Sequence, residues 1–167
     1  MTKEKYNLIL DVDSYKVTHF NQYPQNTKKL YAYIEARNLN SEELIFFGLQ
    51  AFVKKYLLNP ITQDDIDEAE KFLLSHIGVF NRDDWEYILN EHGGFLPIEI
   101  KSLDEGTVTN KKIPLLDITN TDEKVPWLVT YIETALLRSL WYPSSVATIS
   151  REIKKIIFRY LDDTYKF

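Results

Sequence analysis

The sequence predicts an α+β domain in which one antiparallel sheet is partly covered by helices. A chain of 167 residues that is 44% apolar and 14% aromatic is long enough for one compact domain with its own hydrophobic core. Segments of strand-like and helix-like periodicity follow one another in the order strand, helices, strands, helices, unlike the regular alternation of a doubly wound sheet. The chain is also much shorter than the ~250 residues of a complete (β/α)₈ barrel.

The first predicted strand covers residues 28–37, where apolar and polar or aromatic side chains alternate. Its small and aliphatic residues, including Leu30 and Ile34, are expected to face the core. Residues 42–58 have the apolar spacing of a helix. Gly48 inside that segment costs about 1 kcal/mol relative to alanine, so we expect a close contact there.

Capping residues predict the next two helices. Thr62 and Asp65 form a capping pattern with acids in the first turn, and helical apolar spacing follows them. A second helix is expected over Arg82–His92, with Asn81 as its N-cap and Gly93 as its end.

The second half of the chain predicts strands and then helices. Residues 96–101 alternate as a strand, and residues 107–118 have the pattern of a hairpin that turns near Asn110. Two helices are expected to follow, over residues 127–141 and 146–163.

Composition excludes several classes of function. Twenty Lys and Arg against twenty-five Asp and Glu give a net charge of −5, so no basic surface for nucleic acid is expected. Without cysteine there can be no disulfide, thiolate zinc site or cysteine nucleophile. The apolar run Leu8–Leu10 is too short for a secretory signal or for a membrane span of ~20 residues. We therefore expect a cytoplasmic protein with no membrane partner.

One motif suggests metal-dependent phosphate chemistry. Asp11 and Asp13 follow a short apolar segment that we interpret as a strand, and two acids at a strand end resemble the opening of magnesium phosphatases of the haloacid-dehalogenase type. Such enzymes place a small hydroxyl residue or valine where Tyr15 stands, and glycines after it. The interpretation of these acids as turn or capping residues is therefore favoured.

The histidines do not predict a metal site. His76 and His92 are expected at helix C-termini, where a cation complements the helix dipole, and neither has a ligand partner at i+4. His19 lies in a polar segment and is not explained in this way.

Two further features have alternative interpretations. Tyr15 lies in the polar segment 13–19, and its ring could stack on a planar ligand, whereas most other aromatic residues are expected in the core or in interfaces. Arg151 belongs to a basic cluster in the last predicted helix. That cluster is compatible with contact to phosphates or with a solvated face balanced by nearby acids.

Ordered motifs along nearly the whole chain resemble the amino-terminal part of nicotinamide phosphoribosyltransferases. The first motifs are residues 13–20 and 22–27, which carry the Asp13-Ser14-Tyr15-Lys16 segment. The others are residues 33–37, 46–50, 85–89, 96–101, 105–106, 120–122, 132–134, 141–143 and 146–152.

The resemblance implies the fold and the activity. It implies the amino-terminal domain of a type II phosphoribosyltransferase without its α/β barrel. Residues 1–167 would form a single domain, in which residues 127–167 are a terminal helical pair leading toward the barrel. The family joins nicotinamide to phosphoribosyl pyrophosphate, giving nicotinamide mononucleotide and pyrophosphate in NAD salvage. Its members are dimers with shared active sites.

The resemblance also implies binding residues. Tyr15 matches the tyrosine that stacks on the nicotinamide ring, Asp13 matches the acid beside it, and Arg37 matches an arginine that contacts substrate phosphates. Arg151 is a further possible phosphate contact. No catalytic residue and no metal ligand is assigned to this chain, and Mg²⁺ is expected to accompany phosphoribosyl pyrophosphate in the complete enzyme.

The chain departs from the family pattern because it ends at Phe167, before the barrel and its phosphate-binding loops. The residues after Arg37 and the predicted hairpin also look trimmed. Two hypotheses stay open. In the first, the chain is part of an enzyme that is inactive until a barrel-bearing subunit or fragment is supplied, in a homo- or hetero-oligomer. In the second, the chain is a stand-alone binding or dimerisation module derived from the family.

Overall fold

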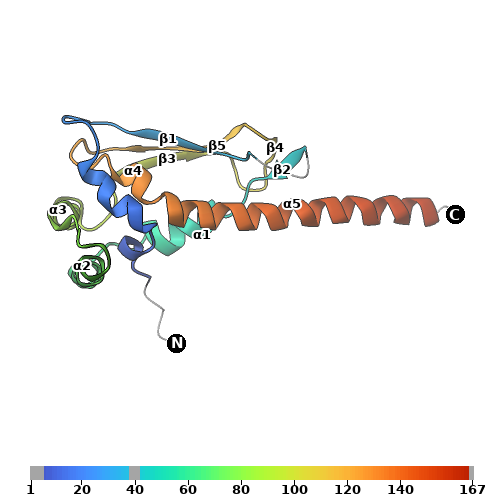
Figure 1. Ribbon diagram of the computed structural model, residues 1–167. Helices are drawn as coiled ribbons and strands as arrows, with labels where there is room; N and C mark the ends of the chain where they lie inside the picture. Colours follow the sequence, from blue (N-terminus) through green and yellow to red (C-terminus); the bar gives the residue numbers. More distant parts are fainter. Residues whose placement is uncertain (1–5, 38–41, 166–167) are drawn as a thin grey trace.

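The computed structural model describes residues 6–37 and 42–165, and it has the predicted α+β architecture (Figure 1). A three-stranded antiparallel sheet lies over the first half of a long helix, and two shorter helices lie side by side at one end. The strands are β1 (Tyr31–Glu35), β2 (Glu43–Ile45), β3 (Ile98–Ser102), β4 (Val108–Asn110) and β5 (Pro114–Asn120). The helices are η1 (Leu8–Leu10), η2 (Ser14–Asn21), α1 (Leu49–Phe52), η3 (Val53–Leu57), α2 (Gln63–Ile77), α3 (Arg82–His92), α4 (Leu128–Tyr131) and α5 (Glu133–Thr164).

The main sheet has the order β1-β5-β3, and both pairings are antiparallel. β5 is the central strand and the most buried one. The alternation predicted for the first strand is confirmed, because Leu30 and Ile34 pack against the core whereas Tyr31 and Tyr33 are exposed. The strand itself is shorter than predicted and covers only Tyr31–Glu35.

The prediction of a helix over residues 42–58 was wrong in its first part. Residues 43–45 form β2, which pairs with β4, and Leu44 and Phe46 are buried. The backbone of Gly48 has a φ of +112°, which ends the extended segment, and α1 begins only after it. The helical spacing beyond Gly48 was correct.

The predicted hairpin over residues 107–118 was also wrong. β4 and β5 do not pair with each other: β4 pairs with β2, and β5 pairs with β1 and β3. Lys112, at a φ of +62°, lies in the link between β4 and β5. The backbone of β5 is hydrogen-bonded to a strand on each side, and its residues Leu115, Leu116 and Ile118 are buried in the hydrophobic core.

The two capped helices agree closely with prediction. Thr62 and Asp65 form the capping box of α2, and Gly78 ends that helix in the left-handed conformation. α3 runs from Arg82 to His92 and ends at Gly93, although the Asn81 side chain donates a hydrogen bond to the Asp84 carboxylate instead of capping the backbone.

The predicted boundary between the last two helices was wrong. A short α4 is followed by α5, which continues through Pro143 for 32 residues. Proline has no N–H to donate to the carbonyl four residues earlier, which here belongs to Ser139. The backbone of Gly48 packs against that carbonyl, and β2 and the residues after it hold the helix by hydrogen bonds from Ile45 N–H to Thr148 and from Phe47 N–H to Ser144.

Two hydrophobic clusters share the interior. One joins the sheet to α1 and the first half of α5, and the other joins α2, α3 and α4 around Trp85, Trp127 and Tyr131. Among the described residues, no helix combines the length and the apolar character needed to cross a bilayer.

Candidate functional site

The segment that carries Asp13 and Tyr15 consists of short helical turns. The apolar residues before Asp11 form the 3₁₀ helix η1, so our interpretation of them as a strand was wrong. Asp13 precedes η2, and Tyr15 lies in its first turn with its side chain 60% exposed. The Tyr15 hydroxyl is 3.5 Å from the Asp13 carboxylate, so the two side chains lie beside each other at the surface.

The start of α5 positions Asp13. The Thr134 hydroxyl donates a hydrogen bond of 2.9 Å to the Asp13 carboxylate and accepts one of 3.2 Å from the Asp13 backbone N–H. The Thr134 and Tyr15 hydroxyls are both directed at the same carboxylate oxygen of Asp13.

Two further contacts attach the same segment to the domain. The Ser14 hydroxyl and His76 Nε2, at the end of α2, are 2.8 Å apart. Lys16 is buried and forms an ion pair with Glu133, which is about half exposed. Adjacent residues at the start of α5, Glu133 and Thr134, therefore hold both Lys16 and Asp13.

Replacing Glu133 by glutamine is expected to lower the free energy of unfolding by about 1–2 kcal/mol. The substitution leaves the buried Lys16 ammonium without a counter-ion. Because Glu133 is about half exposed, water near it can solvate the ammonium and offset part of the lost stability. Lys16→Met is the matched control, because an apolar side chain of similar length needs no partner and should cost less. Urea unfolding of both variants measures the difference, and an equal loss for the two would contradict a charge effect.

Arg37 lies just beyond the end of β1 with an 83% exposed side chain, and its Nε is 3.6 Å from the Glu35 carboxylate. It lines two hollows between β1 and the α4–α5 helices, of about 510 and 270 Å³. Glu133 lines the larger hollow together with Thr130 and Tyr33. Glu133 is therefore shared between the hollow beside Arg37 and the ion pair with Lys16.

Of the site residues expected from the sequence, the structure thus places Asp13 and Tyr15 in contact. Arg37 lines a separate hollow, which is linked to their segment through the Glu133–Lys16 ion pair. The residue types of Glu133 and Thr134 did not predict their positioning roles. The signal available was the motif at residues 132–134, whose role could not be inferred from the residue types alone.

Arg151 lies farther along α5. Its guanidinium is 2.7 Å from Glu43 and 3.3 Å from Glu152. The hydrogen bond and the charge of Arg151 lower the pKa of the Glu43 carboxyl below its usual value. This cation is thus already neutralised by acids of its own domain, and a phosphate contact at Arg151 stays a prediction.

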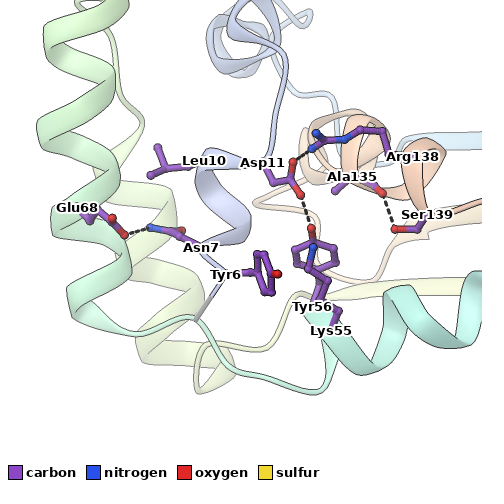
Figure 2. Close-up of a pocket in the computed structure, with 10 residues that line it drawn as sticks. All are labelled: Tyr6, Asn7, Leu10, Asp11, Lys55, Tyr56, Glu68, Ala135, Arg138 and Ser139. Atoms are coloured by element: carbon purple, nitrogen blue, oxygen red, sulfur yellow. Dashed lines mark hydrogen bonds and ion pairs between the residues drawn. The ribbon is translucent and has the colours of Figure 1, made fainter. Parts of the chain in front are cut away.

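Asp11 points in another direction from Asp13. Figure 2 shows its carboxylate paired with Arg138 of α5 and accepting a hydrogen bond from Tyr56, on a hollow of about 610 Å³. Burial, and secondarily Tyr6, raises the pKa of the Tyr56 hydroxyl. Because Asp11 and Asp13 bind different partners, they do not form the paired carboxylates of a magnesium phosphatase. In the described parts of the chain, no group of three or more potential ligands could hold a metal.

The histidines are accounted for by neighbouring groups. His76 and His92 lie in the last turns of α2 and α3, as predicted, and His92 pairs with Asp122 at 2.8 Å. His19 lies on η2 with its ring centroid 5.5 Å from that of Tyr15. The His19 ring therefore lies next to the exposed Tyr15 ring.

Comparison with known proteins identifies the family. Residues 7–100 match the family described as "Nicotinamide phosphoribosyltransferase, N-terminal domain". This chain belongs to that family. The matched region contains Asp13, Tyr15 and Arg37, and so includes the residues assigned to the nicotinamide phosphoribosyltransferase site by resemblance.

Relatives named nicotinamide phosphoribosyltransferase match almost the whole chain. The protein from Xanthomonas campestris pv. campestris is 41% identical over 95% of this chain, and that from Acinetobacter baylyi is 32% identical over 93%. In both cases the chain spans only 34% of the relative's length. It therefore corresponds to part of a nicotinamide phosphoribosyltransferase.

A solved structure supports the fold. The crystal structure of human nicotinic acid phosphoribosyltransferase superposes on 81% of this chain and 26% of its own, with a TM-score of 0.55 and 22% identity. Similarity at this level of identity concerns the fold alone. It agrees with the fold expected for the amino-terminal portion of a nicotinamide phosphoribosyltransferase.

Proposed function

We propose that this chain supplies one wall of a nicotinamide phosphoribosyltransferase active site and is inactive without a barrel. The observation that carries the proposal is the exposed Asp13–Tyr15 pair, held by Thr134 at the start of α5 within a chain of this family. The reaction would join nicotinamide to phosphoribosyl pyrophosphate, releasing nicotinamide mononucleotide and pyrophosphate. The chain would thus be part of a pentosyltransferase of NAD salvage.

Each proposed binding residue has a physical role. The exposed face of Tyr15 suits stacking on the flat pyridine ring of nicotinamide, and the neighbouring Asp13 carboxylate can accept a hydrogen bond from its amide. The guanidinium of Arg37, only weakly engaged by Glu35, can bind phosphate oxygens in a bidentate manner. Stabilisation of charge on the ribose and the departing pyrophosphate would provide most of the rate enhancement.

Magnesium and the partner are part of the same proposal. Mg²⁺ prefers phosphate oxygens with few protein carboxylates, so it would arrive with phosphoribosyl pyrophosphate, and the described residues give it no ligand set. The partner would be a barrel-bearing subunit or fragment in a homo- or hetero-oligomer. The proposed location of the reaction is the cytoplasm, as is typical of the family.

The test is complementation of the full chain with the remainder of a relative. The chain purified alone is expected to form no nicotinamide mononucleotide, whereas addition of the corresponding remainder of the Xanthomonas campestris relative should produce it. Turnover by the chain alone would contradict the proposal, as would complete failure of the two parts to associate.

In the complemented enzyme, Tyr15→Ala is expected to raise the KM for nicotinamide by about tenfold. Loss of one stacking face removes about 1–1.5 kcal/mol of binding, and 1.4 kcal/mol corresponds to a factor of ten. Tyr15→Phe keeps the ring and should retain most of the affinity. Tyr31→Ala is a matched control, because Tyr31 is equally exposed on β1 and lines no hollow described above. Equal effects of Tyr15→Ala and Tyr31→Ala would rule out stacking at Tyr15.

A second candidate function is a stand-alone binding or dimerisation module. It is favoured by one observation, the row of exposed apolar side chains on the second half of α5. If this function is correct, the chain should self-associate and should fail to restore activity to a barrel fragment.

A further inference from the structure

The smaller of the two hollows beside Arg37 lies where β1, β2 and α5 come together. It measures about 270 Å³, and its apolar lining consists of Ile34, Leu44, Leu115, Leu137, Leu140 and Trp141; we call it the Trp141 hollow. An apolar cavity of about 150 Å³ already holds a benzene molecule. The Trp141 hollow is therefore large enough for a hydrocarbon group of several carbon atoms, and its walls favour such a group.

The hydroxyl groups that line the Trp141 hollow are already engaged within the domain. Ser144 donates a hydrogen bond to the Phe47 carbonyl and accepts one from the Phe47 N–H. Thr148 donates to the Ser144 carbonyl, and Ser145 donates to the Trp141 carbonyl. Because each hydroxyl hydrogen is used in this way, these groups do not offer a ligand a donor.

Arg37 is the one cationic side chain among the described residues that line this hollow. Its side chain is 83% exposed, and its Nε lies 3.6 Å from the carboxylate of Glu35, which also lines the hollow. That distance is too long for a hydrogen bond, so the terminal nitrogens of Arg37 keep their N–H groups for a ligand. A guanidinium binds a carboxylate or a phosphate through two parallel hydrogen bonds.

A ligand with a carboxylate head and a short hydrocarbon body matches both features of the Trp141 hollow. The carboxylate would pair with Arg37, and the body would displace water from the apolar lining, each buried methylene strengthening binding about fourfold. A sugar phosphate would also suit the guanidinium, but its hydroxyl groups would lie against leucine side chains without hydrogen-bond partners. The lining therefore favours an apolar carboxylate over a polar anion.

We propose that the Trp141 hollow binds small carboxylates with an apolar body, such as short-chain fatty acids, with Arg37 as the contact for the anion. The site is separate from the surface proposed to bind nicotinamide, because neither Asp13 nor Tyr15 lines it. It shares Arg37 with the proposed phosphate contact, so a carboxylate and a phosphate would exclude each other there. Binding requires neither a barrel nor turnover, and the chain can be tested by itself.

The first test is an NMR titration of the full chain with hexanoate, acetate and 1-hexanol. Hexanoate is expected to bind with a Kd of about 1 mM, which is ordinary for so small a ligand, and to shift the resonances of the lining residues. Acetate lacks the hydrocarbon body and 1-hexanol lacks the charge, so each should bind at least about tenfold more weakly. Equal affinity for hexanoate and either of the other two compounds would overturn the proposal.

Substitutions test the two parts of the site separately. Arg37→Gln should weaken hexanoate binding by about tenfold, and Ser145→Leu, which fills part of the hollow, should weaken it at least as much. Lys101→Gln is the matched control and should bind hexanoate like the original chain. Lys101 is exposed on β3 beside Glu99, as Arg37 is beside Glu35, but it does not line the Trp141 hollow. Circular dichroism verifies that each variant is folded. An unchanged Kd in Arg37→Gln, or an equal loss in Lys101→Gln, would contradict the assignment.

Competition with inorganic pyrophosphate at constant ionic strength distinguishes this site from the proposed function. If Arg37 also contacts substrate phosphates, pyrophosphate should displace hexanoate, and that result would support both roles of Arg37. Hexanoate binding that depends on Arg37 but is insensitive to pyrophosphate would support the carboxylate site and contradict the phosphate contact.

Discussion

Replacing Gly48 by alanine is expected to destabilise the domain by about 3 kcal/mol or more. At a φ of +112° an alanine is strained by about 1–2 kcal/mol. Its Cβ would also lie 2.0 Å from the Ser139 carbonyl oxygen and 3.2 Å from Cγ of Pro143. Backbone and a proline ring cannot move aside easily, so overpacking adds a further ~1–3 kcal/mol.

Gly78→Ala is the control that measures backbone strain without a steric contact. Gly78 has a φ of +72°, and nothing lies within 4 Å of a Cβ built on it. Its substitution should therefore cost only about 1 kcal/mol. Urea unfolding of the two variants is the measurement. Similar losses of stability would show that the contact between Gly48 and the helix around Pro143 contributes nothing.

Trp85→Ala is expected to cost about 3–5 kcal/mol, the usual range for removing a large buried aromatic side chain. Trp85 is 1% exposed, and its ring makes edge contacts with Trp127 and Tyr131 at centroid distances of 5.0 and 5.2 Å. The substitution would open a cavity between α3 and α4. Because the Tyr131 hydroxyl donates a hydrogen bond to the Ile9 carbonyl, the cavity also adjoins the segment that leads to Asp13.

Thermal unfolding measures this effect. For a domain of this size, 1 kcal/mol corresponds to about 2–4 °C, so the midpoint should fall by about 10 °C. Trp141→Ala is the control, because Trp141 is 60% exposed and its loss should change the midpoint by only a few degrees. A small effect of Trp85→Ala would mean that the second cluster repacks around the gap.

The parts of the fold that could be predicted from the sequence depend on local interactions. Thr62 and Asp65 satisfy the first N–H groups of α2 within a single turn, and Gly78 and Gly93 end helices through their own backbone conformations. The alternation of β1 likewise needs only one buried face. The errors occurred where a distant segment decides the structure. Residues 43–45 become a strand because β4 is available to pair with them, and α5 continues through Pro143 because Gly48 and β2 pack against it.

The candidate site likewise has features that could be predicted from local sequence and features that depend on contacts between distant segments. The sequence by itself indicated the family, because its motifs are contiguous stretches of chain, and by resemblance it predicted Asp13, Tyr15 and Arg37 as binding residues. Only the tertiary structure showed that Thr134 and Glu133 hold the segment of Asp13 and Lys16, and that Asp11 belongs to a different pair. The physical reason is separation along the chain. Asp13 and Thr134 are 121 residues apart, and such a hydrogen bond exists only after both cores have formed.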